Sequence, residues 1–168
     1  MSYLDHFQLA DDYITHLDTV MDSITDPFIK SRYTGFLAVT AVTVYELAIK
    51  NIFIDFAEKK HKVLKNFTTT FFHRINGRIK APIVKDEYVS KYGEKYVKKF
   101  SAKLKEKERE ILRAEGASVL TSYGNIIKWR NQFAHEGIIP NTPTYEEVKK
   151  SYKVGKYVIH CLNEAMKR

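Results

Sequence analysis

The sequence predicts an all-α protein, a four-helix up-and-down bundle with a helical insertion between its second and third long helices. Apolar residues recur at intervals of three and four positions over long stretches, which is typical of amphipathic helices. No stretch alternates apolar and polar residues as a strand does, and no dipeptide indicates a tight turn between two strands. We expect residues 1–168 to form one domain, in which residues 61–115 are the insertion.

The first third of the chain predicts two helices separated by a short turn. Residues 3–24 have apolar side chains near helical spacing. Asp26 is a natural N-cap and Pro27 a natural first residue of a helix, so we expect a long second helix from about Pro27 to Lys59. Its inner stripe is expected to consist of Phe36, Val39, Thr43, Leu47, Lys50 or Asn51, Ile54 and Ala57.

The remaining segments also predict helices. Residues 82–93 indicate a short helix, and the charge-dense residues 94–115 indicate a longer one with a solvated face. A helix that begins near Ala117 is expected to end at Gly137, before a loop over residues 140–143. A last helix, capped by Thr144, should reach Met166.

Composition indicates a folded protein of the cytoplasm. The chain is 44% hydrophobic and 29% charged, which is the balance of a globular domain. The single Cys161 excludes an intramolecular disulfide and fits a reducing compartment. The N-terminus has no secretory signal pattern. The most apolar run, residues 35–45, is too short for a membrane span of about 20 residues, so we expect no membrane association.

The net charge of +8 bears on the choice of partner. A basic balance favours a polyanion, and nucleic acid is the leading candidate. The same charge is also compatible with a merely soluble surface, so charge alone does not decide between the two.

Residues 129–137 concentrate more reactive groups than any other stretch. In a helix, Asn131 and His135 share one face, whereas Arg130 lies about 140° away from His135 and reaches the same side through its long side chain. A histidine can exchange protons near neutral pH. An arginine and a histidine five positions apart also arise by chance, and a histidine at a helix end is often only a cap.

Four further residues are candidates for the same site. Glu46 falls beside the inner stripe of the long helix, where a carboxylate is costly unless it is paired. It either orients Arg130 or His135, or forms a structural ion pair with an arginine of a neighbouring helix. Arg74, Arg78 and Lys80 surround a glycine and can present donors to a phosphate. They can equally pair with acidic side chains.

Other familiar chemistries have no sequence support. The chain has no glycine-rich phosphate loop, no HExxH, no clustered cysteines and histidines, and no regular carboxylate pattern. We therefore expect neither a metal nor a cofactor.

The segment from Arg130 to His135 resembles the R-x4-H motif of HEPN domains. The similarity to bacterial HEPN-like nucleases of defence and toxin–antitoxin loci spreads over about residues 5–165. It also includes Tyr45-Glu46-Leu47-Ala48, Arg74-Ile75-Asn76-Gly77-Arg78-Ile79 and His135-Glu136-Gly137.

The resemblance implies a metal-independent endoribonuclease whose site is composed across a homodimer. RNA carries its own nucleophile, the 2′-hydroxyl, so His135 would transfer protons and Arg130 would stabilise the charge on the phosphate. Asn131 would hold the imidazole or contact the phosphate. The products would carry 2′,3′-cyclic phosphate and 5′-hydroxyl ends. A role as a toxin or anti-phage effector, with an antitoxin or defence-system protein as partner, follows from the same resemblance.

Two alternatives stay open at the level of sequence. The first is a catalytically silent HEPN-like module that dimerises and binds a protein or a nucleic acid. The second is a helical DNA-binding adaptor of a restriction-like system, because the basic charge fits DNA as well as RNA.

Overall fold

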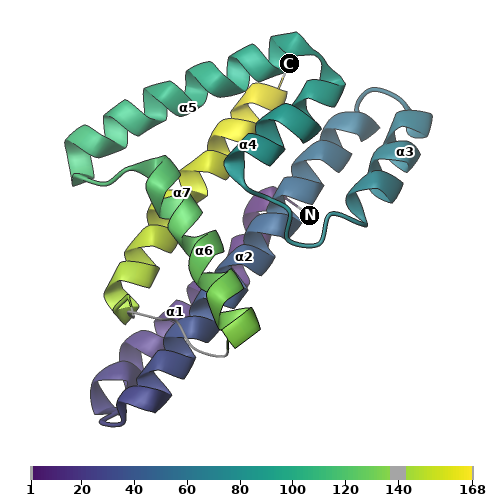
Figure 1. Cartoon of the computed structure of the whole chain (residues 1–168). Coiled ribbons are helices and arrows are strands. Elements are labelled where there is room, and N and C mark those ends of the chain that lie inside the picture. The colour runs from purple at the N-terminus through teal and green to yellow at the C-terminus, as the bar shows by residue number, and fades with distance from the viewer. Residues whose placement is uncertain (1, 137–142, 168) are drawn as a thin grey trace.

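The computed structural model describes residues 2–136 and 143–167, and every regular element in these ranges is a helix (Figure 1). The prediction of an all-α protein is therefore confirmed. The predicted helix end at Gly137 and most of the predicted loop over residues 140–143 lie outside the described residues.

The N-terminal helices form as the sequence predicts. A 3-10 turn, Tyr3–Phe7, leads into α1, Gln8–Val20, and a second 3-10 turn, Met21–Ser23, closes the segment. The next helix, α2, spans Pro27–Glu58. Its first turn is fixed by Asp26, whose side chain accepts a hydrogen bond of 2.8 Å from the backbone N–H of Phe28.

The helix α2 is the centre of the fold, because α1, α3, α6 and α7 all pack against it (Figure 1). The predicted inner stripe was wrong in register. Phe36 is 51% exposed and Leu47 is 40% exposed, whereas Leu37 and Ala48, the residues that follow each of them, are fully buried. Burial on several sides of a helix leaves little amphipathic contrast, so the sequence could not fix which face points inward. The residues of α2 that are less than 5% exposed include Leu37, Ala38, Ala41, Val42, Val44, Tyr45, Ala48, Ile49, Ile52 and Phe53.

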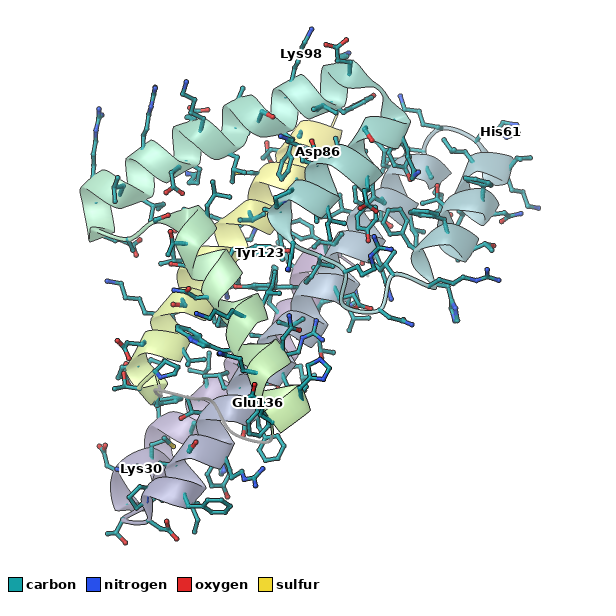
Figure 2. The ribbon with its side chains drawn as sticks, viewed as in Figure 1. Lys30, His61, Asp86, Lys98, Tyr123 and Glu136 are labelled. Carbon is teal, nitrogen blue, oxygen red and sulfur yellow. The ribbon has the colours of Figure 1, made fainter. Side chains whose placement is uncertain are left out.

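The predicted insertion contains several helices. They are α3, Lys62–Phe72; α4, Ala81–Ile83; a π-turn, Val84–Tyr88; a 3-10 turn, Val89–Tyr92; and α5, Glu94–Glu115. Stacked aromatic rings attach this region to the C-terminal half of α2: the Phe53 ring lies 4.6 Å from that of Phe72 and 5.3 Å from that of Tyr92. The helix α5 packs along α7, while Lys98 on its outer side points away from the body (Figure 2). The region is therefore part of the common core.

The last two helices, α6 at Val119–Glu136 and α7 at Tyr145–Met166, close the core against α2. Tyr45 of α2 lies between Tyr123 of α6 and Tyr152 of α7, with ring centroids 5.3 and 5.7 Å away. Its hydroxyl donates a hydrogen bond of 2.5 Å to the carbonyl oxygen of Tyr152. Complete burial raises the pKa of Tyr45 well above its ordinary value, so this hydroxyl acts as a neutral donor.

One helix of the described residues, α2, is long and apolar enough to cross a membrane by length and composition alone. Residues 35–45, the uninterrupted apolar run, are only one part of this helix. In the fold, 56% of the most apolar 18-residue window is buried inside the protein, as is usual for the core helix of a soluble domain.

The close approach of α6 and α7 predicts a strong effect of adding one methyl group at Gly155. A Cβ there would lie 2.6 Å from the Tyr45 hydroxyl and 3.1 Å from the Tyr123 backbone. We expect Gly155→Ala to lower the free energy of unfolding by ~1–3 kcal/mol, because the helices must separate. Urea denaturation measures this change.

Gly124→Ala is the matched control, since a Cβ at this other helical glycine meets nothing within 4 Å. It should raise the free energy of unfolding by up to ~1 kcal/mol through helix propensity. Equal stability losses in the two variants would contradict the packing argument.

Candidate functional site

Arg130 lies on the inward side of α6 and reaches the loop that follows α3. Its Nη2 donates a hydrogen bond of 3.2 Å to the carbonyl oxygen of Gly77. Its Nε is buried, and no hydrogen-bond partner for it exists among the described residues. The guanidinium is therefore held at one end while part of its donor capacity is unused.

Gly77 connects Arg130 to α2. Its backbone N–H donates a hydrogen bond to Oε2 of Glu46, and Oε1 of Glu46 accepts one of 2.6 Å from Lys50. Gly77 has a positive φ of 77°, and a Cβ on it would lie 2.4 Å from Nη2 of Arg130. Only glycine satisfies both conditions without strain. Gly77 is thus held by side chains from two helices, Glu46 of α2 and Arg130 of α6.

Neither sequence interpretation of Glu46 is found in the form in which it was stated. Its cationic partner is Lys50, one turn further along the same helix, and not an arginine of a neighbouring helix. Among the described residues, no hydrogen bond joins Glu46 directly to Arg130 or His135. Glu46 and Arg130 are therefore linked through Gly77, and a role of Glu46 in the site stays a prediction.

His135 lies in the last described turn of α6 and is exposed. Phe133, on another side of the helix, is buried and packs edge-on against Phe36 at 5.3 Å, and a Cβ on Gly35 would collide with its ring. This packing anchors the end of α6 on α2 and leaves His135 facing outward. Figure 2 shows the same end of the helix at Glu136.

Asn131 and Lys80 line one groove beside α6. Its volume is about 650 Å³, and most of its lining is apolar, including Pro82, Leu120 and Ile127. Asn131 is partly buried, whereas Lys80 is exposed. The structure therefore brings Asn131 and Lys80 together on the outer side of α6, separate from the Arg130–Gly77 contact.

The two predicted arginines of the loop differ in their contacts. Arg78 forms a salt bridge of 3.1 Å with Glu87, and its carbonyl oxygen accepts a hydrogen bond of 2.7 Å from Tyr88. Arg78 is thus paired with an acidic side chain, which is one of the two alternatives that the sequence left open. Arg74 is exposed, and no salt bridge involves it in the described part of the chain.

Arg130 and Glu46 therefore both contact Gly77. His135 is exposed about one and a half turns further along α6. The family model of RiboL-PSP-HEPN matches residues 5–168. The chain belongs to this HEPN family. No curated protein and no solved structure matches it. The resemblance inferred from the sequence motifs is confirmed at the level of the family.

The role of Gly77 in this HEPN domain was not predicted from the sequence, where the glycine was named only as the residue that Arg74, Arg78 and Lys80 surround. Asn76 has a φ of 32° and Gly77 one of 77°. An Asn-Gly pair is the usual sequence signal for such consecutive positive values. That signal could have identified the turn, but not the arginine that contacts it from 53 positions further along the chain.

Among the described residues of the HEPN domain, no three histidine, cysteine or carboxylate side chains are grouped as a metal site would require.

A double-mutant cycle tests the linkage through Gly77. We expect Glu46→Ala and Arg130→Ala to destabilise the protein, with a coupling of ~0.5–3 kcal/mol in the double variant, because both side chains hold the same loop residue. Urea denaturation of the three variants gives this quantity.

The matched control pairs Arg130→Ala with Asp26→Ala, which removes the distant N-cap of α2. The losses in free energy of unfolding caused by these two changes should be additive within ~0.5 kcal/mol. Additive effects for Glu46 and Arg130 would show that Gly77 does not link them.

Proposed function

We propose that this HEPN domain is a metal-independent endoribonuclease. The observation that supports it best is the under-used guanidinium of Arg130, set on the same helix as the exposed His135. A buried donor without a partner carries a free-energy cost, and a guanidinium whose donors are not all used in the fold is suited to bind phosphate oxygens. Membership of the RiboL-PSP-HEPN family supports the same assignment.

In the proposed reaction, neutral His135 removes the proton of a ribose 2′-hydroxyl. The 2′-oxygen forms a bond to the adjacent phosphorus while the bond from phosphorus to the 5′-oxygen breaks. The leaving 5′-oxygen takes a proton from a protonated imidazole or from water. Arg130 stabilises the negative charge that develops on the phosphoryl oxygens. The products are a 2′,3′-cyclic phosphate and a 5′-hydroxyl.

The positions of Arg130 and His135 favour a site shared between two copies. One side chain contacts the inner loop, whereas the other faces outward from the last turn of α6. A second copy placed against the outer side of α6 contributes its own histidine, so that one imidazole acts as base and the other as acid. Asn131 lies on the same outer side and would orient an imidazole or contact the phosphate.

The remaining features of the proposal concern context. We propose a cytoplasmic toxin or anti-phage effector, restrained by an antitoxin or another protein of the same defence system. We also propose that α1, α2, α6 and α7 form the up-and-down four-helix bundle and that residues 61–115 are inserted into it. The packing of these helices around α2 supports that arrangement.

The second candidate function is a catalytically silent HEPN module that binds a partner protein or nucleic acid. It is favoured by the structural use of Arg130, whose hydrogen bond to Gly77 serves the fold, and by the separation of His135 from that contact. Activity measurements distinguish the two functions.

We expect the purified protein to cleave mixed cellular RNA in the presence of EDTA. His135→Ala should lower the rate about 10²- to 10⁴-fold, as expected for the loss of a general acid–base catalyst. Arg130→Lys should also lower it, because lysine lacks the planar fork that fits a phosphate. End-group analysis should find 2′,3′-cyclic phosphates.

His16→Ala serves as the control, since this exposed histidine of α1 lies outside the site. It should retain full activity. Equal cleavage by the wild type and by His135→Ala would refute the proposed role of His135, and an absence of cleavage at every pH would favour the silent module.

We also expect a homodimer. Light scattering at micromolar concentration should give twice the chain mass of 19.6 kDa. At saturating RNA, an excess of His135→Ala protein should reduce the activity of the wild type, because mixed dimers lack one imidazole. A monomer at these concentrations, with activity independent of dilution, would contradict the shared site.

A further inference from the structure

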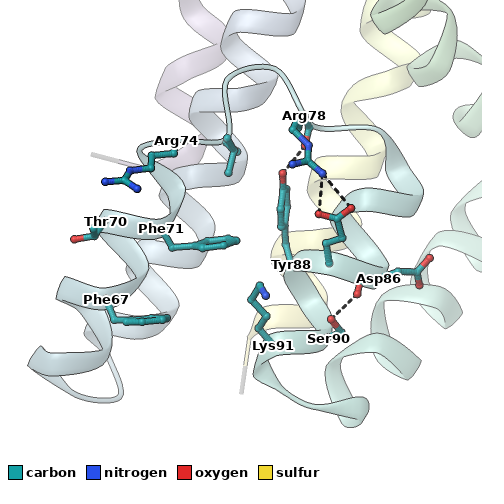
Figure 3. A pocket seen from close by; sticks show the side chains of 11 residues that line it. Phe67, Thr70, Phe71, Arg74, Arg78, Asp86, Tyr88, Ser90 and Lys91 are labelled. Atoms are coloured by element: carbon teal, nitrogen blue, oxygen red, sulfur yellow. Dashed lines mark hydrogen bonds and ion pairs between the residues drawn. The ribbon is translucent and has the colours of Figure 1, made fainter.

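A cleft of about 640 Å³ lies between α3 and the turns Val84–Tyr92 (Figure 3). Phe67 and Phe71 project into it from α3, while Tyr88 and Lys91 line the opposite wall. None of these side chains takes part in the Arg130–Gly77 contact, so the cleft is a feature separate from the candidate active site.

The cleft presents aromatic surface to solvent. Phe67 is 69% exposed although it is a phenylalanine in the middle of a helix. Phe71, one turn later, is supported edge-on by Tyr88 at 5.9 Å, and the Lys91 ammonium lies 5.1 Å from its ring centroid. Burial of an exposed apolar ring is favourable, so a flat ligand that covers the rings of Phe67 and Phe71 would be stabilised.

The charges around the rings favour an anionic ligand. The two carboxylates of the cleft are paired: Asp86 with Lys85 at 3.3 Å, and Glu87 with Arg78 at 3.1 Å. In the described part of the chain, no salt bridge involves Lys91 or Arg74. One cation without an acidic partner, Lys91, therefore stands beside the Phe71 ring, and this combination complements a base joined to a phosphate.

The cleft also connects to the candidate active site through the chain itself. The wall formed by α3 ends at Phe72 and continues through Arg74 and Ile75, both of which line the cleft. Two residues later the chain reaches Gly77, whose carbonyl oxygen holds Arg130. A nucleotide in the cleft and a phosphate near Arg130 would thus contact opposite ends of one short loop.

We infer that this cleft binds an unpaired base of single-stranded RNA, with the Phe67 ring as the stacking surface and Lys91 beside a backbone phosphate. A base in a duplex is already stacked and paired and cannot enter, so the cleft selects single-stranded segments. The inference rests on the proposed function, since it names the structural class of RNA that the ribonuclease binds.

The test uses the full chain and a fluorescein-labelled 2′-O-methyl RNA 12-mer without self-complementarity. The methyl group blocks the nucleophile, so binding is measured apart from cleavage. We expect Phe67→Ala to weaken binding about tenfold, which corresponds to ~1.4 kcal/mol and lies within the range for one stacked base. Phe28→Ala is the matched control, since this phenylalanine is 59% exposed at the far end of α2. It should bind as the wild type does.

A second measurement locates the base directly. Ultraviolet cross-linking of the same 12-mer carrying 5-iodouridine, followed by tryptic digestion, should label the peptide of residues 66–74, which contains Phe67 and Phe71. The inference would be overturned by any of three results: Phe67→Ala binds the 12-mer as tightly as the wild type, cross-links are confined to other peptides, or the wild type binds a duplex of the 12-mer and its complement as tightly as the single strand. Binding that depends on Phe67 in a protein that cleaves no RNA would refute the ribonuclease proposal alone. Cleavage of RNA together with binding that does not depend on Phe67 would refute only the inference about the cleft.

Discussion

The structure depends on two adjacent residues of α2 that face different neighbours. Tyr45 is buried between Tyr123 and Tyr152, and its hydrogen bond to a backbone carbonyl ties α2 to α7. Glu46, the next residue, accepts the N–H of Gly77. Since consecutive residues of a helix point about 100° apart, one turn of α2 fixes both the core and the loop that holds Arg130. A shift of α2 would therefore disturb the packing and the candidate site together.

The sequence predicted the helices well because their end signals are local. Asp26 before Pro27 and Thr144 before Glu147 act within one turn, and the structure shows both caps. The inward face of α2 was predicted wrongly, since a helix surrounded by four others has apolar residues on most sides. Local signals identify where a helix begins, whereas its rotation depends on neighbours that are distant in sequence.

The same distinction applies to the candidate site. Arg130, Glu46 and the loop near Arg74 could be named from motifs, because each contains its own polar signature. Their connection through Gly77 could not, since it joins positions 46, 77 and 130 by backbone groups that every residue possesses. One of the two sequence interpretations paired Glu46 with an arginine of a neighbouring helix, but its partner is Lys50, because an i, i+4 pair on one helix forms without any tertiary arrangement.

Arg130 and His135 illustrate how one helix can hold one polar side chain within the fold and expose another. Phe133 anchors the end of α6 on Gly35 and Phe36, and this contact sets the rotation of the whole segment. With that rotation fixed, Arg130 must face the loop and His135 must face away. A single protomer therefore stabilises the arginine and exposes the histidine. The aromatic cleft lies closer in the chain to the Arg130 contacts than to His135, because its α3 wall leads directly into the loop residue that contacts Arg130. Under the proposed function, an RNA strand that followed this wall would approach Arg130 from within one protomer, and a histidine acting on the same phosphate would come from a second copy.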